Sequence, residues 1–190
     1  MENSTPALYN DCERILITRE EIAAMVDRMG AEIQATYENS GHRLVMVVIL
    51  KGSMPFAADL MKRLTLPVEL EFMKVSSYGA GTKSSGEIKV SLDLKRDDLQ
   101  DIDLLVVEDI VDSGRTLSRL TQLLKNRNAH SVRTCTLLDK PSRREVDFVP
   151  DFCGTEVPDE FVVGYGLDYD EKYRNLPFVG VLKREVYEQK

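Results

Sequence analysis

The segment from residue 44 to residue 50 constrains the fold more than any other, because every residue in it is apolar. A strand on a half-solvated sheet alternates apolar and polar residues, whereas a continuous apolar run is typical of a strand buried on both faces. Residues 104–107 and 132–138 are predicted to form further buried strands. Helical patterns separate these strands, and this alternation predicts a parallel sheet with right-handed crossovers.

Three amphipathic helices are predicted from apolar residues at helical spacing. The first begins at Thr18, which forms a capping box with Glu21, and ends at the turn formed by residues 39–41. The second spans about residues 54–64, and the third carries a stripe of leucines between residues 117 and 124. Shorter strands are predicted at residues 67–75, 88–94, 161–163 and 178–182.

Loops after the parallel strands are predicted to form the ligand site, because ligands of such sheets bind beyond the carboxyl ends of the strands. This rule brings together Lys51 and Gly52, residues 109–116 and the segment after Leu138. The segment 76–86 is rich in serine and glycine and is predicted to be a mobile loop.

The composition is that of an ordinary globular protein, with 43% hydrophobic and 30% charged residues among 190, which fits a single domain. The net charge of −7 argues against nucleic acid or an anionic membrane as a partner. No apolar run approaches the ~20 residues of a membrane helix, and no signal peptide is apparent. The three cysteines lack the spacing of a disulfide framework or a zinc site. These features predict a cytoplasmic protein.

An acidic segment follows the strand predicted at residues 104–107. Two adjacent carboxylates, Glu108 and Asp109, are costly there unless magnesium or hydroxyl donors compensate them. The segment from Asp112 to Thr116 contains serine, glycine and threonine directly before a helix, a composition suited to binding a phosphate. A sugar phosphate carries hydroxyl groups that suit the carboxylates and a phosphate that suits the turn. The alternative is that Asp112 or Ser113 merely caps the helix, which leaves the two carboxylates unexplained.

Residues 106–117 resemble the signature of the type I phosphoribosyltransferase family, an apolar run followed by two acids and then an acid with small residues. The resemblance extends from about Ile15 to Leu182. Four further motifs support it: Leu50-Lys51-Gly52-Ser53, Ser76-Ser77-Tyr78-Gly79, Leu138-Asp139-Lys140-Pro141 and residues 161–169. The last two of these motifs are similar to those of the 6-oxopurine branch of the family.

The resemblance implies an α/β fold with a central, mainly parallel, twisted sheet flanked by helices and a small hood from the terminal segments. It implies one domain over residues 1–190, with a core of about 40–155 and a hood of about 1–20 and 155–190. The implied activity is purine salvage, in which the 5-phosphoribosyl group of phosphoribosyl pyrophosphate passes to hypoxanthine or guanine and yields IMP or GMP plus pyrophosphate. A xanthine-preferring transferase and a non-catalytic, ligand-binding regulator are the alternatives. Relatives form homodimers or homotetramers.

The resemblance also assigns a binding site for phosphoribosyl pyrophosphate. Glu108 and Asp109 would bind the ribose hydroxyls, partly through Mg²⁺, and the turn after Asp112 would hold the 5′-phosphate without a specific role for the side chain of Arg115. Lys51 and Gly52 would bind pyrophosphate after a cis peptide bond. The full set is Lys51, Gly52, Ser77, Tyr78, Glu108, Asp109, Asp112, Ser113, Gly114, Arg115, Thr116 and Arg174.

The same resemblance assigns the catalytic role to Asp112, as a general base or hydrogen-bond acceptor facing N7 of the purine. Ser77 and Tyr78 would belong to a lid over the reacting centre, and Arg174 would contact pyrophosphate. The residues implied in purine binding are Lys140 for O6, Phe161 for stacking, Val162 for the base edge, and Asp168. The implied magnesium ligands are Glu108, Asp109 and Asp168.

Taken singly, several of these residues have simpler interpretations. Lys51 could be a solvated lysine in a capping turn, Lys140 a surface lysine, and Phe161 a core residue. The acids at 168–171 could form a solvated turn. Glu160 stands where relatives commonly have a lysine, which leaves the packing around the purine open.

Overall fold

The computed structural model describes residues 7–77 and 88–188. Its main element is a six-stranded sheet in the order β4-β3-β2-β5-β6-β7. Every neighbouring pair is parallel except β3 and β4, so the predicted mainly parallel sheet is confirmed. The strands are β2 (Arg43–Ile49), β3 (Val68–Ser77), β4 (Ile88–Leu92), β5 (Ile102–Val111), β6 (Ser131–Asp139) and β7 (Phe152–Glu156).

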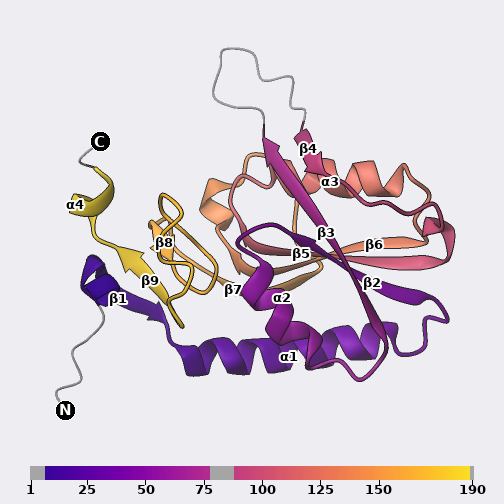
Figure 1. The fold of residues 1–190 in the computed structure, drawn as a ribbon, viewed down its shortest axis with the longest axis horizontal. Helices are drawn as coiled ribbons and strands as arrows, with labels where there is room; N and C mark the ends of the chain where they lie inside the picture. The colour runs from indigo at the N-terminus through magenta and orange to yellow at the C-terminus, as the bar shows by residue number, and fades with distance from the viewer. Residues whose placement is uncertain (1–6, 78–87, 189–190) are drawn as a thin grey trace.

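Helices cover both faces of this sheet (Figure 1), and the three predicted helices are present. They are α1 (Arg19–Tyr37), α2 (Met54–Met61) and α3 (Arg115–Lys125). One face of β2, formed by Leu44, Met46 and Val48, packs with α1 and α2. The other face, formed by Val45, Val47 and Ile49, packs with α3. The uninterrupted apolar run therefore reflects a strand between two hydrophobic layers. The capping box of Thr18 and Glu21 is also present.

The strand before the acidic segment is longer than predicted. It was expected to end at Val107, but β5 continues to Val111, and so Glu108 and Asp109 are strand residues. The extension is stabilised by pairing with β6, where Ile110 lies opposite Leu138 and Val111 opposite Asp139. Helix α2 ends at Met61 instead of about residue 64, and β4 ends at Leu92 instead of 94.

A second, three-stranded antiparallel sheet corresponds to the predicted hood, and Figure 1 shows it at one end of the large sheet. It consists of β1 (Cys12–Ile17), β9 (Val179–Leu182) and β8 (Val162–Val163), and β9 is central. The short helix α4 (Arg184–Tyr187) follows β9. The remaining elements are the 3-10 helices η1 (Ala7–Asp11), η2 (Leu99–Asp101) and η3 (Pro141–Arg143). Strands β1 and β7 were not predicted.

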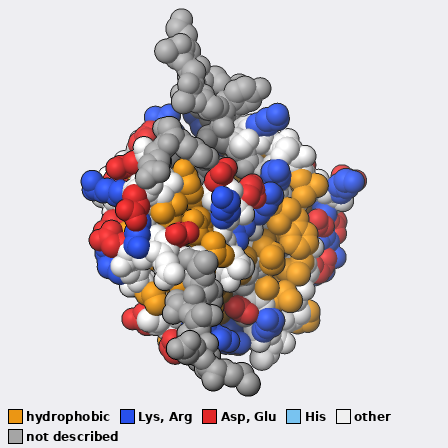
Figure 2. Space-filling view, turned by 60° about the vertical axis from the view of Figure 1, so that its left-hand side comes forward, with side chains coloured by type: hydrophobic (Ala, Val, Ile, Leu, Met, Phe, Trp, Pro, Cys, Tyr) orange, Lys and Arg blue, Asp and Glu red, His pale blue; other side chains and the backbone are white. Residues whose placement is uncertain are grey.

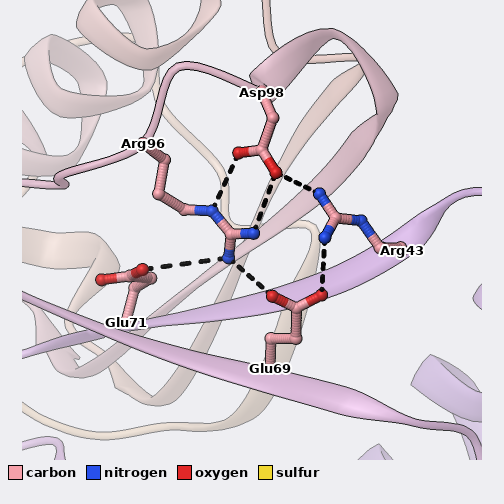
Figure 3. Close-up of polar contacts among 5 residues, drawn as sticks. All are labelled: Arg43, Glu69, Glu71, Arg96 and Asp98. Atoms are coloured by element: carbon pink, nitrogen blue, oxygen red, sulfur yellow. Dashed lines mark hydrogen bonds and ion pairs between the residues drawn. The ribbon is translucent and has the colours of Figure 1, made fainter.

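A charged cluster lies at the amino ends of β2 and β3, and Figure 3 shows its members. The Arg96 side chain, which is only 12% exposed, donates to Glu69 at 2.8 Å and to Asp98 at 3.0 Å. Arg43 also pairs with Glu69 and Asp98, and Glu71 lies 3.8 Å from Arg96. The cluster therefore fastens the segment after β4 to the start of the two strands. The hydrogen bonds from Arg96 and Arg43 hold the pKa of Asp98 below its ordinary value.

The helices in the described ranges 7–77 and 88–188 include none with the length and apolar character needed to cross a membrane.

Candidate active site

The acidic pair lies in β5, just before the strand ends. Burial raises the pKa of Glu108 well above its ordinary value, and the adjacent Asp109 charge adds to this effect. Burial also raises the pKa of Asp109, although its hydrogen bond with Glu108 and the positive charge of Arg174 act in the opposite direction. Two carboxyl groups that resist ionisation together form a site where a cation or hydroxyl donors would be stabilised.

The turn between β5 and α3 owes its shape to Gly114. Its φ of 79° lies in the left-handed region, and a Cβ there would sit 2.9 Å from Cδ of Arg144. Gly114 is itself the N-cap residue of α3, and as a glycine it has no side chain to cap the helix. The N-cap is therefore neither Asp112 nor Ser113, although Ser113 Oγ accepts from the amide of Arg115 at 3.4 Å. The first amides of α3 face the turn, as in an anion site.

The loop after β2 packs directly against the acidic pair. A Cβ built on Gly52 would overlap Oδ2 of Asp109, so only glycine allows this approach. The peptide bond between Leu50 and Lys51 is cis, as the family resemblance implied. Lys51 Nζ donates to Glu171 at 2.9 Å, and both side chains are more than half exposed.

Two cavities meet at Ile110 and Asp112, which line both of them. The first, of about 320 Å³, lies beside the β5–α3 turn. The second, of about 240 Å³, lies between the end of β5 and the hood. Of the predicted site residues, the first is lined by Glu108, Asp112, Ser113, Gly114 and Thr116. The second is lined by Asp109, Asp112, Lys140, Phe161, Val162 and Asp168.

The lysine of the second cavity is held by the hood. Lys140, directly after β6, donates from Nζ to the backbone carbonyl of Glu160 at 2.7 Å. Glu160 is in turn ion-paired with Arg14 of β1. The carbonyl of Phe161 accepts from the amide of Leu182 in β9 at 2.8 Å. Phe161 is 38% exposed, which excludes the alternative that it is a core residue.

Arg174 is fixed by the hood loop. It pairs with Asp168 at 2.9 Å and with Glu171 at 3.4 Å, and it donates to the carbonyl of Gly166 at 2.8 Å. Asp168 also accepts from the amide of Glu171. Asp168 and Glu171 thus contact Arg174, and Glu171 also contacts Lys51, although the Glu171 side chain is itself 66% exposed.

Two arginines at the site were not predicted. Arg143 donates from Nε to Oδ1 of Asp112 at 2.8 Å, and Arg144 donates to the Asp112 carbonyl at 2.7 Å and pairs with Asp139. They fix the side chain and backbone of Asp112, respectively. The only signal in the sequence was two consecutive arginines shortly after Lys140, in the loop already expected to face the pocket.

Three further predicted residues are Arg115, Ser77 and Tyr78. The Arg115 side chain pairs with Glu145 at 2.6 Å. Ser77 is the last residue of β3, next to Ser76, which lines the first cavity. Tyr78 and the rest of the predicted loop to residue 86 lie outside the described residues.

Within the part of the chain that the structure describes, no three His, Cys, Asp or Glu side chains form a ready-made metal cage. Magnesium does not require one, since it commonly takes one or two carboxylates and completes its coordination with water and substrate phosphates. Glu108 and Asp109 fit that pattern, because they supply oxygen ligands whose charges repel each other.

Together, the doubly covered parallel sheet, the acidic strand end and the glycine turn define the class of α/β enzymes that bind a ribose phosphate. The family described as "Phosphoribosyl transferase domain" matches residues 17–170. The chain belongs to this family, and its fold is the type I phosphoribosyltransferase fold.

Individual relatives agree with this membership. The chain is 51% identical over 181 residues to a hypoxanthine-guanine phosphoribosyltransferase of Bacillus subtilis, covering 95% of this chain and 99% of that protein. It is 49% identical over 183 residues to the bifunctional protein TilS/HprT of Listeria monocytogenes, covering 96% of this chain but only 28% of that protein's length. A crystal structure of a hypoxanthine phosphoribosyltransferase from Staphylococcus aureus superposes with a TM-score of 0.90 at 45% identity, covering 98% and 99% of the two chains.

Proposed function

We propose that this chain transfers the 5-phosphoribosyl group of phosphoribosyl pyrophosphate to hypoxanthine or guanine, a reaction of purine salvage. The observation that carries the proposal is the pair of cavities that meet at Asp112. One has the donors of a phosphate site, and the other has a lysine and an aromatic ring suited to an oxopurine. The names of the relatives from Bacillus subtilis and Staphylococcus aureus support this assignment.

On the sugar side, Glu108 and Asp109 bind the ribose hydroxyls. Residues 113–116 hold the 5′-phosphate through their amides and hydroxyls, a role that the glycine N-cap at the start of α3 supports. Lys51, Gly52 and Arg174 hold the pyrophosphate, and charge-assisted hydrogen bonds make such contacts strong. Ser77 and Tyr78 belong to a lid that excludes water from the reacting centre.

Asp112 acts where the two substrates meet. Its carboxylate accepts the proton or hydrogen bond of the purine N7 and stabilises positive charge that develops at C1′ of the sugar. The hydrogen bond from Arg143 to Oδ1 orients the Asp112 carboxylate and leaves Oδ2 for this task.

On the base side, Lys140 selects the oxopurine. The Glu160 carbonyl accepts one of its three N–H donors, which leaves others for O6 of hypoxanthine or guanine. Adenine presents an amino group at that position, and two donors then face each other. A buried mismatch of this kind gives discrimination on the order of 10⁴. Phe161 stacks on the ring, and the Val162 backbone bonds its edge.

Magnesium is the cofactor in this proposal, with Glu108, Asp109 and Asp168 as its protein ligands. The oxygen donors and the raised pKa of Glu108 support this choice, because a divalent cation offsets the repulsion between the paired carboxylates. When bound, the ion neutralises charge on the leaving pyrophosphate.

An assay of pyrophosphate release with hypoxanthine, guanine, xanthine and adenine tests the proposal. Release with hypoxanthine and guanine but not adenine is expected. A dominant rate with xanthine would favour the xanthine-preferring alternative, and no release with any base would favour a ligand-binding regulator. Efficient use of adenine would contradict the role of Lys140.

A second experiment tests the role of Asp112. Asp112→Asn should lower kcat by about 10²- to 10⁴-fold with an unchanged fold; unchanged turnover would rule out its assigned role.

The same proposal includes a homodimeric or homotetrameric, cytoplasmic protein that acts on small molecules and not on nucleic acid or membranes. Three free cysteines support a reducing compartment. An uncovered apolar surface on α2 and β3, with exposed Met54, Met61, Leu70 and Phe72, supports self-association. We place the boundary between the core and the hood near residues 20 and 155.

A further inference from the structure

Phe161 belongs to a cluster of three aromatic rings. Its ring stacks on that of Tyr187, with centroids 4.9 Å apart and an angle of 22° between the planes. Tyr169 packs edge-on against Phe161 at 5.5 Å and 89°. Such stacked and edge-on arrangements are the favoured geometries of aromatic pairs.

Of the two stacked rings, Phe161 is the one that borders the second cavity. Phe161 lines that cavity together with Lys140 and Asp112, whereas Tyr187 is not among the residues that line it. The stack therefore places Tyr187 behind Phe161, in contact with the ring but outside the cavity that a flat ligand would enter.

The backbone keeps the two rings in register. Leu182, the last residue of β9, donates its amide to the carbonyl of Phe161, and α4 begins two residues later and ends at Tyr187. Tyr187 also packs against the apolar cluster of the hood, which includes Leu182 and Phe178. The ring of Tyr187 is thus anchored, whereas Phe161 is 38% exposed, so the stack limits the rotamers that its ring can adopt.

We propose that Tyr187 is a positioning residue for the purine, which holds the Phe161 ring in the orientation that stacks on the base. This inference rests on the proposed function, since it takes Phe161 as the stacking partner. Helix α4 then takes part in recognition of the base, although it contributes no residue to the cavity.

The test compares Tyr187→Leu and Tyr187→Phe with a matched control, Tyr9→Leu. Tyr9 forms an edge-on pair with Phe178 in the same hood, at 4.9 Å and 88°, and lines neither cavity. Steady-state assays give kcat and the KM for hypoxanthine and for phosphoribosyl pyrophosphate. Tyr187→Leu should raise the KM for hypoxanthine about 3- to 10-fold, as expected for loss of one aromatic pair, and leave the other KM unchanged.

The two remaining variants separate positioning from stability. Tyr187→Phe keeps the ring and should restore the KM for hypoxanthine, and Tyr9→Leu should lower only the unfolding temperature. The proposal is overturned if Tyr187→Leu leaves the KM for hypoxanthine unchanged, or if Tyr187→Phe is as impaired as Tyr187→Leu. A lower KM in Tyr187→Leu would also overturn it, because Tyr187 would then compete with the base.

A measurement without substrate keeps this inference separate from the proposed function. The ring protons of Phe161, assigned in the NMR spectrum with Phe161→Leu, should lose a ring-current shift in Tyr187→Leu but not in Tyr187→Phe. If the wild-type chain turns over no oxopurine, the proposed function fails, whereas the ring-current shift still reports whether Tyr187 orients Phe161. An unchanged spectrum in Tyr187→Leu would dismiss the stack itself.

Discussion

At the scale of single residues, the site depends on close approaches that only glycine permits. Gly52 lies against the Asp109 carboxylate, and a Cβ built on Gly166 would overlap the Gly52 carbonyl. Gly166 also has a φ of 103°, which side-chain-bearing residues rarely adopt. Two glycines from distant parts of the chain therefore bring the β2 loop, the acidic pair and the hood into contact.

Gly52→Ala should impair catalysis through Asp109, because the new methyl group must displace that carboxylate. We expect a kcat/KM for phosphoribosyl pyrophosphate at least 10-fold lower and a loss of about 1–3 kcal/mol in the free energy of unfolding, typical of overpacking. Steady-state assays and urea denaturation measure the two effects.

Gly30→Ala is the matched control. Gly30 lies on α1 and lines neither cavity, and a Cβ there would also be too close to a neighbour, 2.5 Å from Cβ of Arg63. It should change stability without changing kcat/KM. A Gly52→Ala enzyme with wild-type kcat/KM would show that Asp109 tolerates displacement.

Residues with a strong local pattern could be predicted from the sequence, and residues that act through tertiary contacts could not. Asp112 and Lys140 follow buried strands, so their place at the pocket edge followed from the rule for parallel sheets. Arg143 and Tyr187 became visible only through their contacts with Asp112 and Phe161. A pair of arginines in a loop, or a tyrosine in a short terminal helix, does not by itself identify the side chain that it contacts.

At the scale of secondary-structure elements, β5 shows why strand ends are hard to predict. Polar residues normally favour an end, and Glu108 and Asp109 suggested one at Val107. Pairing with β6 stabilises the strand for four more residues, a tertiary effect that outweighs local polarity. Strand β7 was missed because it contains Gly154, a residue type that is rare in strands. The glycine is required by a tertiary contact, since a Cβ there would overlap the carbonyl of Leu137.

The charged cluster around Arg96 makes a prediction for the pH dependence of stability. The pKa of Asp98 is lowered in the folded protein by hydrogen bonds from Arg96 and then Arg43. A carboxyl group with a lowered pKa stabilises the fold above its unfolded pKa of about 3.9, and this contribution is lost as the pH falls through the folded pKa. The free energy of unfolding should therefore decrease below about pH 4.

Asp98→Asn should be less stable than the wild type at pH 7, and the difference should shrink as the pH falls toward 2. Urea denaturation at several pH values gives the two curves. Asp97→Asn, next in the chain and outside the cluster, should follow the wild type. Curves for Asp98→Asn and wild type that stay parallel down to pH 2 would show that the cluster does not set the acid response.

At the scale of the whole molecule, the hood and the core sheet each supply part of the site. Lys140 of the core is held by the Glu160 carbonyl of the hood, and Lys51 of the core by Glu171. Strands β8 and β9 were predicted from short apolar runs, whereas β1 shows no clear alternation, and the hood that the three strands form was implied only by the family resemblance. The pairing of β1 with β9 joins residues more than 160 positions apart, and a local pattern cannot report such contacts.

One face of the core remains uncovered on the side of α1 and α2. Leu70 and Phe72 of β3 are paired with Met46 and Val48, which face these helices, yet they are 40% and 41% exposed. Met54 and Met61 form an exposed stripe on α2, and Figure 2 shows a broad hydrophobic area on the surface of the molecule. Patches of this kind commonly mark protein interfaces, and homo-oligomers are the commonest outcome.

Phe72→Glu should therefore shift the chain from an oligomer to a monomer, because a carboxylate in the centre of an apolar interface is costly to bury. Sedimentation velocity at several protein concentrations measures the change. Val149→Glu places the same charge on a residue that is 79% exposed and far more accessible, and it should leave the oligomer intact. A wild-type chain that sediments as a monomer, or a Phe72→Glu variant that sediments as the wild-type oligomer, would show that this face does not mediate self-association.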